Sequence, residues 1–151
     1  MRAIVQRVDS ASLKVGNELV SSIERGMVCY LGVGRGDSER EMLWLARKIA
    51  GLRIFADEIG KMNLSLKDCD FEIMVVSQFT LYGDIQNGYR PGFSNAEAPE
   101  PAEKMYEQFC TELEKSGIKK VARGVFGADM LIEQQNNGPV TIILDTATIN
   151  L

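Results

Sequence analysis

Short runs of apolar and β-branched residues, divided by glycine-containing turns, fill the first 33 residues and predict strands. Residues 2–8 form the first such run. Residues 11–15 and 18–24 form a predicted hairpin, because Gly16-Asn17 suits a two-residue loop. The run from Gly26 to Val33 is almost continuously apolar, which indicates a strand buried on both faces.

Two later segments change to helical spacing. Ser38-Glu39-Arg40-Glu41 has the form of a capping box, and the apolar residues that follow it predict a helix at about 39–52. A second helix is expected after Pro101, and Gly117 suits the position after its end. Its apolar stripe consists of Ala102, Met105, Tyr106, Phe109, Cys110 and Leu113.

The remaining pattern predicts more strands and one long loop. Residues 53–55 are short and strand-like, residues 71–76 form a predicted central strand, and the last strands are expected at 129–135 and 140–147. Residues 83–100 are rich in Gly, Asn, Pro and Asp and are expected to form a long loop. Together these elements predict one α+β domain over residues 1–151, with a curved or barrel-like, antiparallel-rich sheet and two amphipathic helices.

Asn136-Asn137-Gly138-Pro139 lies between the last two predicted strands. Asn-Gly is a strong turn signal because both residues tolerate positive φ. From these residues alone we favour a hairpin turn that opens the last strand. The alternative is that Gly138-Pro139 presents bare backbone to a closely approaching ligand.

Composition restricts the class of protein. A hydrophobic content of 45% and a charged content of 25% are ordinary for a globular domain, and no apolar run is long enough for a membrane helix. The chain enters a strand-like pattern at once, without the apolar core of a signal peptide, so we expect a cytoplasmic protein with no membrane partner.

A net charge of −4 argues against non-specific coating of nucleic acid, but one basic patch could bind the end of an RNA. The densest patch is Lys115, Lys119, Lys120 and Arg123.

Histidine is absent from the chain, which excludes Ser-His-Asp and Cys-His catalysis and any histidine metal site. The three cysteines, Cys29, Cys69 and Cys110, form no Cys-x-x-Cys pair, so neither a disulfide framework nor a zinc site is indicated. We predict no cofactor and no metal. An enzyme of this composition would depend on backbone donors, hydroxyls, carboxylates, lysines or the substrate itself.

The segment Ser77-Gln78-Phe79-Thr80 combines two hydroxyls and an amide at the point where a buried strand meets a loop. Backbone N–H groups at such a strand end can be aimed at a developing oxyanion. Ordinary cross-strand polar residues are the alternative interpretation, and on these residues alone it is preferred.

Two segments taken together resemble the signature motifs of the D-aminoacyl-tRNA deacylases, namely Ser77-Gln78-Phe79-Thr80-Leu81 and Asn137-Gly138-Pro139-Val140-Thr141. The resemblance covers nearly the full length in the right order. The other matching stretches are Ala3–Val8, Arg53–Phe55, Gly60–Asn63, Arg90–Ser94 and Phe126–Met130.

The resemblance implies a homodimeric enzyme that removes D-amino acids, and also glycine, from wrongly charged tRNA. It implies a cis Gly138-Pro139 bond, and a pair that projects into the partner's active site as a backbone wall against L-amino acids. Arg7 would brace this loop, and Phe126 and Met130 would hold the terminal adenosine. Each of these residues also has a purely structural interpretation: Arg7 as a surface arginine, and Phe126 and Met130 as core residues.

At the reaction centre, Thr80 matches a residue once regarded as the family's nucleophile. Because no histidine is present to activate it, we expect attack by water, with the Phe79 N–H stabilising the oxyanion and the ribose 2′-hydroxyl assisting proton transfer. Ser77, Gln78 and Thr80 would orient the site. Some of the four basic residues of the patch would follow acceptor-stem phosphates of the tRNA, and no DNA partner is expected.

Two functions of other classes remain open from the sequence. One is a non-catalytic module that binds an RNA end or a nucleotide, which would have no need of a chiral wall. The other is a small-molecule esterase that uses Thr80 or Ser77, which the missing histidine argues against.

Overall fold

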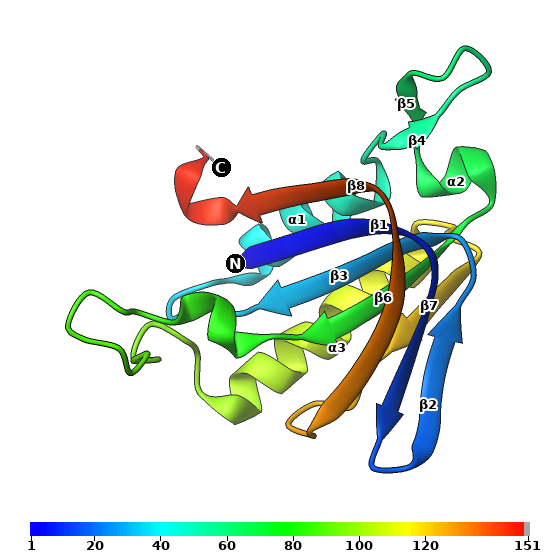
Figure 1. Cartoon of the computed structure of the whole chain (residues 1–151). Coiled ribbons are helices and arrows are strands. Elements are labelled where there is room, and N and C mark those ends of the chain that lie inside the picture. Colours follow the sequence, from blue (N-terminus) through cyan, green and yellow to red (C-terminus); the bar gives the residue numbers. More distant parts are fainter. Residues whose placement is uncertain (150–151) are drawn as a thin grey trace.

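A curved mixed sheet forms the body of the molecule in the computed structural model, which describes residues 1–149 (Figure 1). The sheet order is β2-β1-β3-β6-β7, and β8 pairs with β1. β1 runs antiparallel to β2, β3 and β8, whereas β6 runs parallel to both β3 and β7. The strands are β1 (Arg2–Val15), β2 (Glu18–Ile23), β3 (Gly26–Gly32), β6 (Glu72–Ser77), β7 (Lys120–Arg123) and β8 (Met130–Asp145).

The predicted α+β class with a barrel-like sheet is confirmed, and several predicted elements lie where the pattern placed them. β1 and β2 form the hairpin, with Gly16 at φ +58° in its turn, and β3 is almost wholly buried. β6 is central, with β3 on one side and β7 on the other. One boundary differs, because β1 continues without a break through Asp9 and Ser10, where two separate strands were expected.

Helices α1 (Glu39–Ala50) and α3 (Pro99–Lys115) lie on the same face of the sheet (Figure 1). The capping box of α1 is formed, since Ser38 caps the first turn and the Glu41 carboxylate accepts from the Ser38 N–H at 2.9 Å. α3 begins at Pro99, two residues before Pro101, because Pro99 is itself suited to a first turn. Gly117 follows the end of α3 at φ +79°.

Apolar side chains fill both faces of the sheet. The larger core lies between the sheet and the two helices and includes Leu45, Phe109 and the buried Cys29 and Cys110. A smaller core, which includes Leu13 and Met74, lies on the opposite face, because Met74 alternates along β6 with Ile73 and Val75 of the larger core. This packing fixes the ends of β6 and β7, where the polar residues of the candidate site begin.

The short strand expected at 53–55 is present only from Phe55 onward, in β4. Four other short elements were not predicted, because three or four residues carry too little periodicity to be recognised. β4 (Phe55–Ala56) and β5 (Met62–Leu64) make a small arm that projects from the sheet, and α2 (Leu66–Cys69) follows it (Figure 1). The 3₁₀ turns are η1 (Phe79–Tyr82) and η2 (Thr146–Thr148). None of the helices described in residues 1–149 is long and apolar enough to span a membrane.

Candidate active site

The end of β6 turns directly into η1, and this junction carries the first predicted motif. Ser77 is the last residue of β6, and the Gln78 N–H donates to the Leu31 carbonyl at 2.7 Å, which fixes the start of the turn. Within residues 1–149, neither the Phe79 nor the Thr80 N–H donates a hydrogen bond. Two backbone donors are therefore available to a ligand at this point.

A cavity of about 540 Å³ opens beside this turn. Ser77, Gln78 and Phe79 line one side, and Phe126 and Met130, at the start of β8, line another. The structure thus brings together two groups of predicted residues that are almost 50 positions apart in the chain. A volume of this size lies within the range of small-molecule sites.

Thr80 does not line the cavity. Its side chain is exposed, and its hydroxyl accepts a hydrogen bond from Gln78 Nε2. A hydroxyl in this position can orient the Gln78 amide, but it does not face the space that a substrate would occupy.

Phe126 and Met130 are both half-buried, so each also contributes to the core, as the structural interpretation expected. Met130 Sδ accepts from the Val125 N–H at 3.4 Å, which closes the turn between β7 and β8. Tyr106 of α3 supports the same region, donating to the Val75 carbonyl at 2.9 Å and accepting from the Gly124 N–H at 3.1 Å. Burial raises the pKa of Tyr106, so its hydroxyl stays protonated and keeps both bonds.

Phe93 is a cavity residue to which the sequence pattern assigned no role. Its ring lies edge-on to the Phe79 ring, with centroids 5.0 Å apart, and the two rings form one rim of the cavity. The sequence held one signal that could have identified Phe93 as a site residue. It lies in the stretch Arg90–Ser94, which carries part of the family resemblance.

The predicted hairpin turn at residues 136–139 is wrong. The chain does not reverse there, because β8 continues from Met130 to Asp145 along the same partner strand, β1. Gln6 pairs with Thr141 and Val8 with Asn136, so the single Arg7 faces four residues, 137–140, which form a wide bulge. The long β1 offers ladder partners on both sides of the bulge, and this outweighs the local turn signal.

Gly138 and Pro139 form the exposed crest of this bulge, and the bond between them is cis. Gly138 adopts φ +125°, a conformation that L-residues rarely adopt, and a Cβ there would come 3.0 Å from the Arg7 guanidinium. The crest lies eight residues beyond Met130, roughly 20 Å or more along β8. Within one chain, then, the Gly138-Pro139 pair does not reach the cavity.

Arg7 holds the bulge from below. Its Nε donates to the Asn137 carbonyl at 3.0 Å, and a terminal nitrogen donates to the Ile54 carbonyl at 2.7 Å. The fork of the guanidinium thus ties the bulge to the base of the β4–β5 arm.

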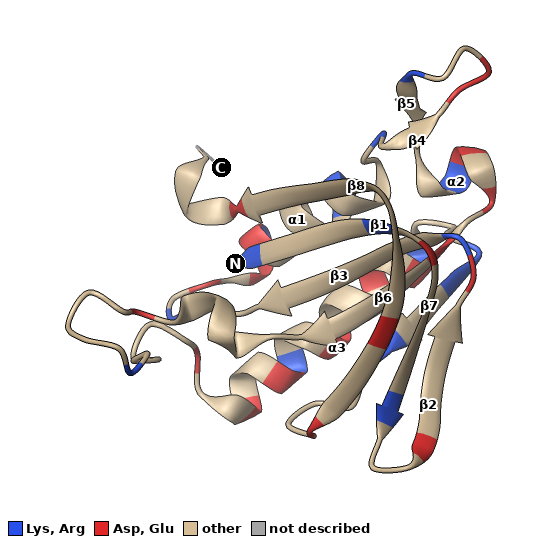
Figure 2. Cartoon of the chain, in the orientation of Figure 1, with Lys and Arg blue, Asp and Glu red and all other residues tan. Residues whose placement is uncertain are grey.

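Lys115, Lys119 and Lys120 of the basic patch lie away from the cavity, whereas Arg123 ends β7 beside Val75. Lys120 is the first residue of β7 and pairs with Glu72 in β6, and Lys119 directly precedes it. Glu72 is five residues, or about 16 Å, before Ser77. Lys115 pairs with Glu112 at 2.6 Å, Lys119 with Glu72 at 3.8 Å, and Arg123 with Glu114 at 2.7 Å. Lys120 Nζ donates to the Ser22 carbonyl, and Figure 2 shows acidic segments interspersed with basic ones along α3. A role for this patch in tRNA contact stays a prediction.

The site offers backbone amides, aromatic rings and neutral polar groups. Two carboxylates, Glu97 and Asp129, also line the cavity; one Glu97 oxygen accepts from the Ala98 N–H at 2.7 Å. Among residues 1–149, His, Cys, Asp and Glu side chains form no group of three that could hold a metal ion. Such a site can bind an aromatic base and stabilise an oxyanion.

Known proteins share this chain's fold over nearly its whole length. A solved structure described as c-Myc DNA Unwinding Element Binding Protein superposes with a TM-score of 0.90, at 42% identity, covering 97% of this chain and 99% of the other. A second, described as a probable eukaryotic D-amino acid tRNA deacylase, is only 19% identical, yet it superposes with a TM-score of 0.82 and covers 95% and 97% of the two chains. The second likeness concerns the fold alone.

Curated relatives are closer in sequence. The D-aminoacyl-tRNA deacylase of Magnetococcus marinus is 52% identical over 145 residues, covering 96% of each chain. Those of Desulfotalea psychrophila and Thermotoga petrophila are 50% and 49% identical over 149 residues, covering 99% of each chain. The model of the family described as D-Tyr-tRNA(Tyr) deacylase matches residues 4–145. Because these matches run through both signature segments and the cavity, the chain belongs to the D-Tyr-tRNA(Tyr) deacylase family.

Proposed function

We propose that the protein hydrolyses the ester bond of D-aminoacyl-tRNA, and of glycine wrongly attached to tRNA, releasing free amino acid and tRNA. The observation that carries this proposal is the cavity, which is lined by Phe79, whose N–H is unpaired, and by Phe126 and Met130. Membership of the family and the relatives that are about half identical support the same reaction.

In the proposed reaction, the terminal adenosine enters between Phe126 and Met130, where stacking and sulfur–aromatic contact suit a base. This places the ester carbonyl beside the Phe79 N–H. Water attacks the carbonyl carbon, and the Phe79 N–H stabilises the negative charge that develops on the carbonyl oxygen. The bond to the ribose oxygen then breaks, and that oxygen takes up a proton with the help of the neighbouring 2′-hydroxyl. Ser77, Gln78 and Thr80 orient the site and its water.

The cavity of a single chain lacks the Gly138-Pro139 wall that would reject L-amino acids. We propose a homodimer in which Gly138 and Pro139 of the partner subunit complete the cavity wall. Three observations support this arrangement: the crest is exposed, Arg7 holds it rigidly, and it lies far from the cavity of its own chain. An L-side chain would collide with this wall, whereas hydrogen fits, so glycine passes and the D-side chain points away. Selection is by exclusion, so one site can accept many D-amino acids.

We propose tRNA, not DNA, as the nucleic-acid partner. The net charge is −4, and three of the four residues of the densest basic patch are ion-paired, which disfavours coating of a duplex. Because its substrate arises during translation, we place the protein in the cytoplasm.

The test is deacylation of D-Tyr-tRNA and L-Tyr-tRNA by the purified protein under the same conditions. The proposal predicts rapid release of D-tyrosine and release of L-tyrosine at the uncatalysed rate. Equal rates for the two esters, or no hydrolysis of either, would contradict it.

A further inference from the structure

A row of three residues crosses the sheet directly beneath the active-site turn η1. Arg2 in β1 pairs with Gly32 in β3 on one side and with Asp145 in β8 on the other. Gly32 leaves room for the turn, because a Cβ there would come 3.0 Å from the Gln78 carbonyl oxygen and 3.2 Å from the Tyr82 ring. The turn is therefore seated on the sheet, next to the Arg2 side chain.

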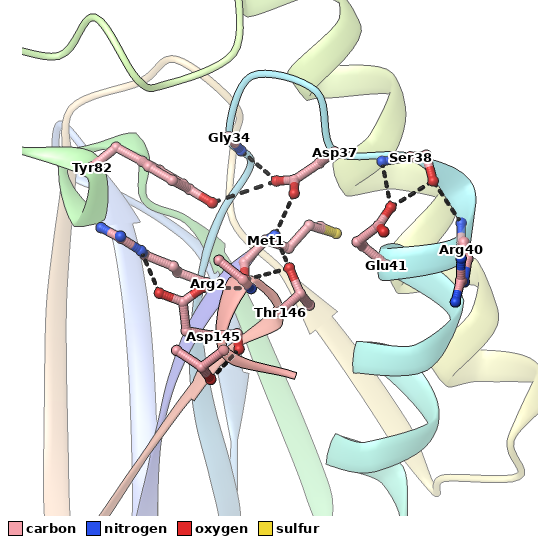
Figure 3. A network of polar contacts seen from close by, with 12 residues as sticks. Met1, Arg2, Gly34, Asp37, Ser38, Arg40, Glu41, Tyr82, Asp145 and Thr146 are labelled. Carbon is pink, nitrogen blue, oxygen red and sulfur yellow. Dashed lines mark hydrogen bonds and ion pairs between the residues drawn. The ribbon is translucent and has the colours of Figure 1, made fainter. Parts of the chain in front are cut away.

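The Arg2 guanidinium bonds to the turn η1 and is itself held by a carboxylate of β8. One terminal nitrogen donates to the Leu81 carbonyl at 3.0 Å, and Nε donates to the Asp145 carboxylate at 2.8 Å. The guanidinium carbon lies 4.6 Å from the centre of the Tyr82 ring (Figure 3). A lysine could not make these contacts together, because its single ammonium lacks the planar fork.

Tyr82, the last residue of the turn, packs against the loop that follows β3. Its ring fills the space above Gly34, where a Cβ would lie 2.5 Å from the ring, and its hydroxyl points to Asp37 Oδ2 at 3.4 Å (Figure 3). Asp37 is fixed in turn by the Gly34 N–H at 2.6 Å and the Met1 amino group at 2.5 Å. Burial, together with the nearby Asp37, raises the pKa of Tyr82, which keeps its hydroxyl a donor.

The turn that Arg2 and Tyr82 hold is the one that presents the Phe79 N–H to the cavity. Its start is tied to β3 through the Gln78 N–H, so its remaining freedom is a movement of the Leu81–Tyr82 end. We propose that Arg2 and Tyr82 are positioning residues for the reaction, setting the direction of the Phe79 N–H without touching the substrate. The inference rests on the proposed function, in which that N–H stabilises the oxyanion. Displacement of a catalytic group by about 1 Å can cost about 100-fold in rate.

The test separates chemistry from binding. In single-turnover deacylation of D-Tyr-tRNA, Arg2→Ala should lower the rate about tenfold or more, and Arg2→Lys should fall between it and the unmodified protein. Binding of uncharged tRNA should change by less than about twofold, because Arg2 does not touch the tRNA. Asp145→Asn, which removes only the charge that holds Arg2, should lower the rate in the same direction and guards against misfolding of Arg2→Ala.

Lys48→Ala is the matched control, because Lys48 also lies over an aromatic ring, Trp44 at 5.4 Å, but on α1. Its rate should equal that of the unmodified protein. Hydrogen exchange gives a readout that needs no activity: the amides of Leu81 and Gly83, which are bonded within the turn, should exchange faster in Arg2→Ala.

Rates for folded Arg2→Ala and Asp145→Asn within about twofold of the unmodified protein would overturn the proposal, as would a loss confined to tRNA binding. If the unmodified protein hydrolysed no D-ester, the proposed function would fail instead. Unchanged exchange at Leu81 would then show separately that Arg2 does not hold the turn.

Discussion

Thr80 lies one residue beyond Phe79, outside the cavity, with its hydroxyl engaged by the Gln78 amide. No histidine is present to take its proton. At the scale of single residues the proposed reaction therefore depends on backbone atoms, while the Arg7 and Arg2 side chains bond to backbone carbonyls near them. This division of roles predicts which substitutions matter.

Thr80→Ala should retain most activity, with kcat/KM for D-Tyr-tRNA within about threefold of the unmodified protein, because the substitution removes only the hydroxyl that orients the Gln78 amide. The measurement is steady-state deacylation, accompanied by mass spectrometry of the protein quenched during turnover. Detection of an acyl group on Thr80 would contradict the account and restore threonine as the nucleophile.

Arg7→Ala should reduce chiral selection more than it reduces catalysis. Without its bonds to the Asn137 and Ile54 carbonyls the bulge can move, so the ratio of D- to L-ester hydrolysis should fall about tenfold or more, while the D-rate changes less. Arg47→Ala is the matched control, since Arg47 also donates to a carbonyl, that of Leu43 at 3.3 Å, on the surface of α1. An unchanged ratio in folded Arg7→Ala would show that Arg7 does not support the wall.

At the scale of elements, the structure shows which signals in the sequence were sufficient. The capping box of α1, the glycine turn between β1 and β2 and the apolar run of β3 each depend on local chemistry, and each lies where it was predicted. Residues 136–140 do not form the predicted turn, because their conformation depends on pairing with β1, a long strand more than 120 residues earlier in the chain. Long-range pairing overrides a local turn preference, and no local pattern contains that information.

The parallel pairing of β6 with β3 and β7 explains why the site lies where it does. Parallel strands bring their carboxyl ends to one edge of the sheet, and Ser77, Gly124 and the cavity lie at that edge. The motif Ser77–Thr80 was recognisable in the sequence. Its supports, namely Arg2, Tyr82 and Asp37, were not, because they come from three separate segments and carry no spacing signature.

Lys115 and Lys120, which belong to the basic patch and lie at the opposite end of β6 and β7 from the cavity, allow a prediction at this scale. If Lys115 and Lys120 follow acceptor-stem phosphates, the double variant Lys115→Glu/Lys120→Glu should weaken tRNA binding and flatten its salt dependence, by about 0.9 in slope for each phosphate that is no longer neutralised. Arg40→Glu/Lys48→Glu, with the same change of charge on α1, is the control. An unchanged slope would mean that the patch, already paired with Glu112 and the Ser22 carbonyl, is only a solvated face.

At the scale of the whole molecule, the proposed chiral wall requires a second chain, because the Gly138-Pro139 crest does not reach the cavity of its own chain. Sedimentation equilibrium should therefore give twice the 16.7 kDa mass of one chain at concentrations where the enzyme discriminates. Cysteine pairs placed at position 139 and beside the cavity should cross-link two chains and not one. A monomer that still rejects L-esters would remove the partner from the explanation.

In the proposed site the Gly138-Pro139 wall excludes an L-side chain, whereas the D-side chain makes no specific contact. Deacylation of one tRNA carrying D-alanine, glycine or L-alanine, compared under single-turnover conditions, tests this exclusion. The D-alanyl and glycyl esters should be hydrolysed at similar rates, within about tenfold, and the L-alanyl ester should be stable, because only the L-alanyl ester places a side-chain carbon against the Gly138-Pro139 wall. Hydrolysis of the L-alanyl ester at the glycyl rate, or rejection of the glycyl ester together with it, would contradict the account.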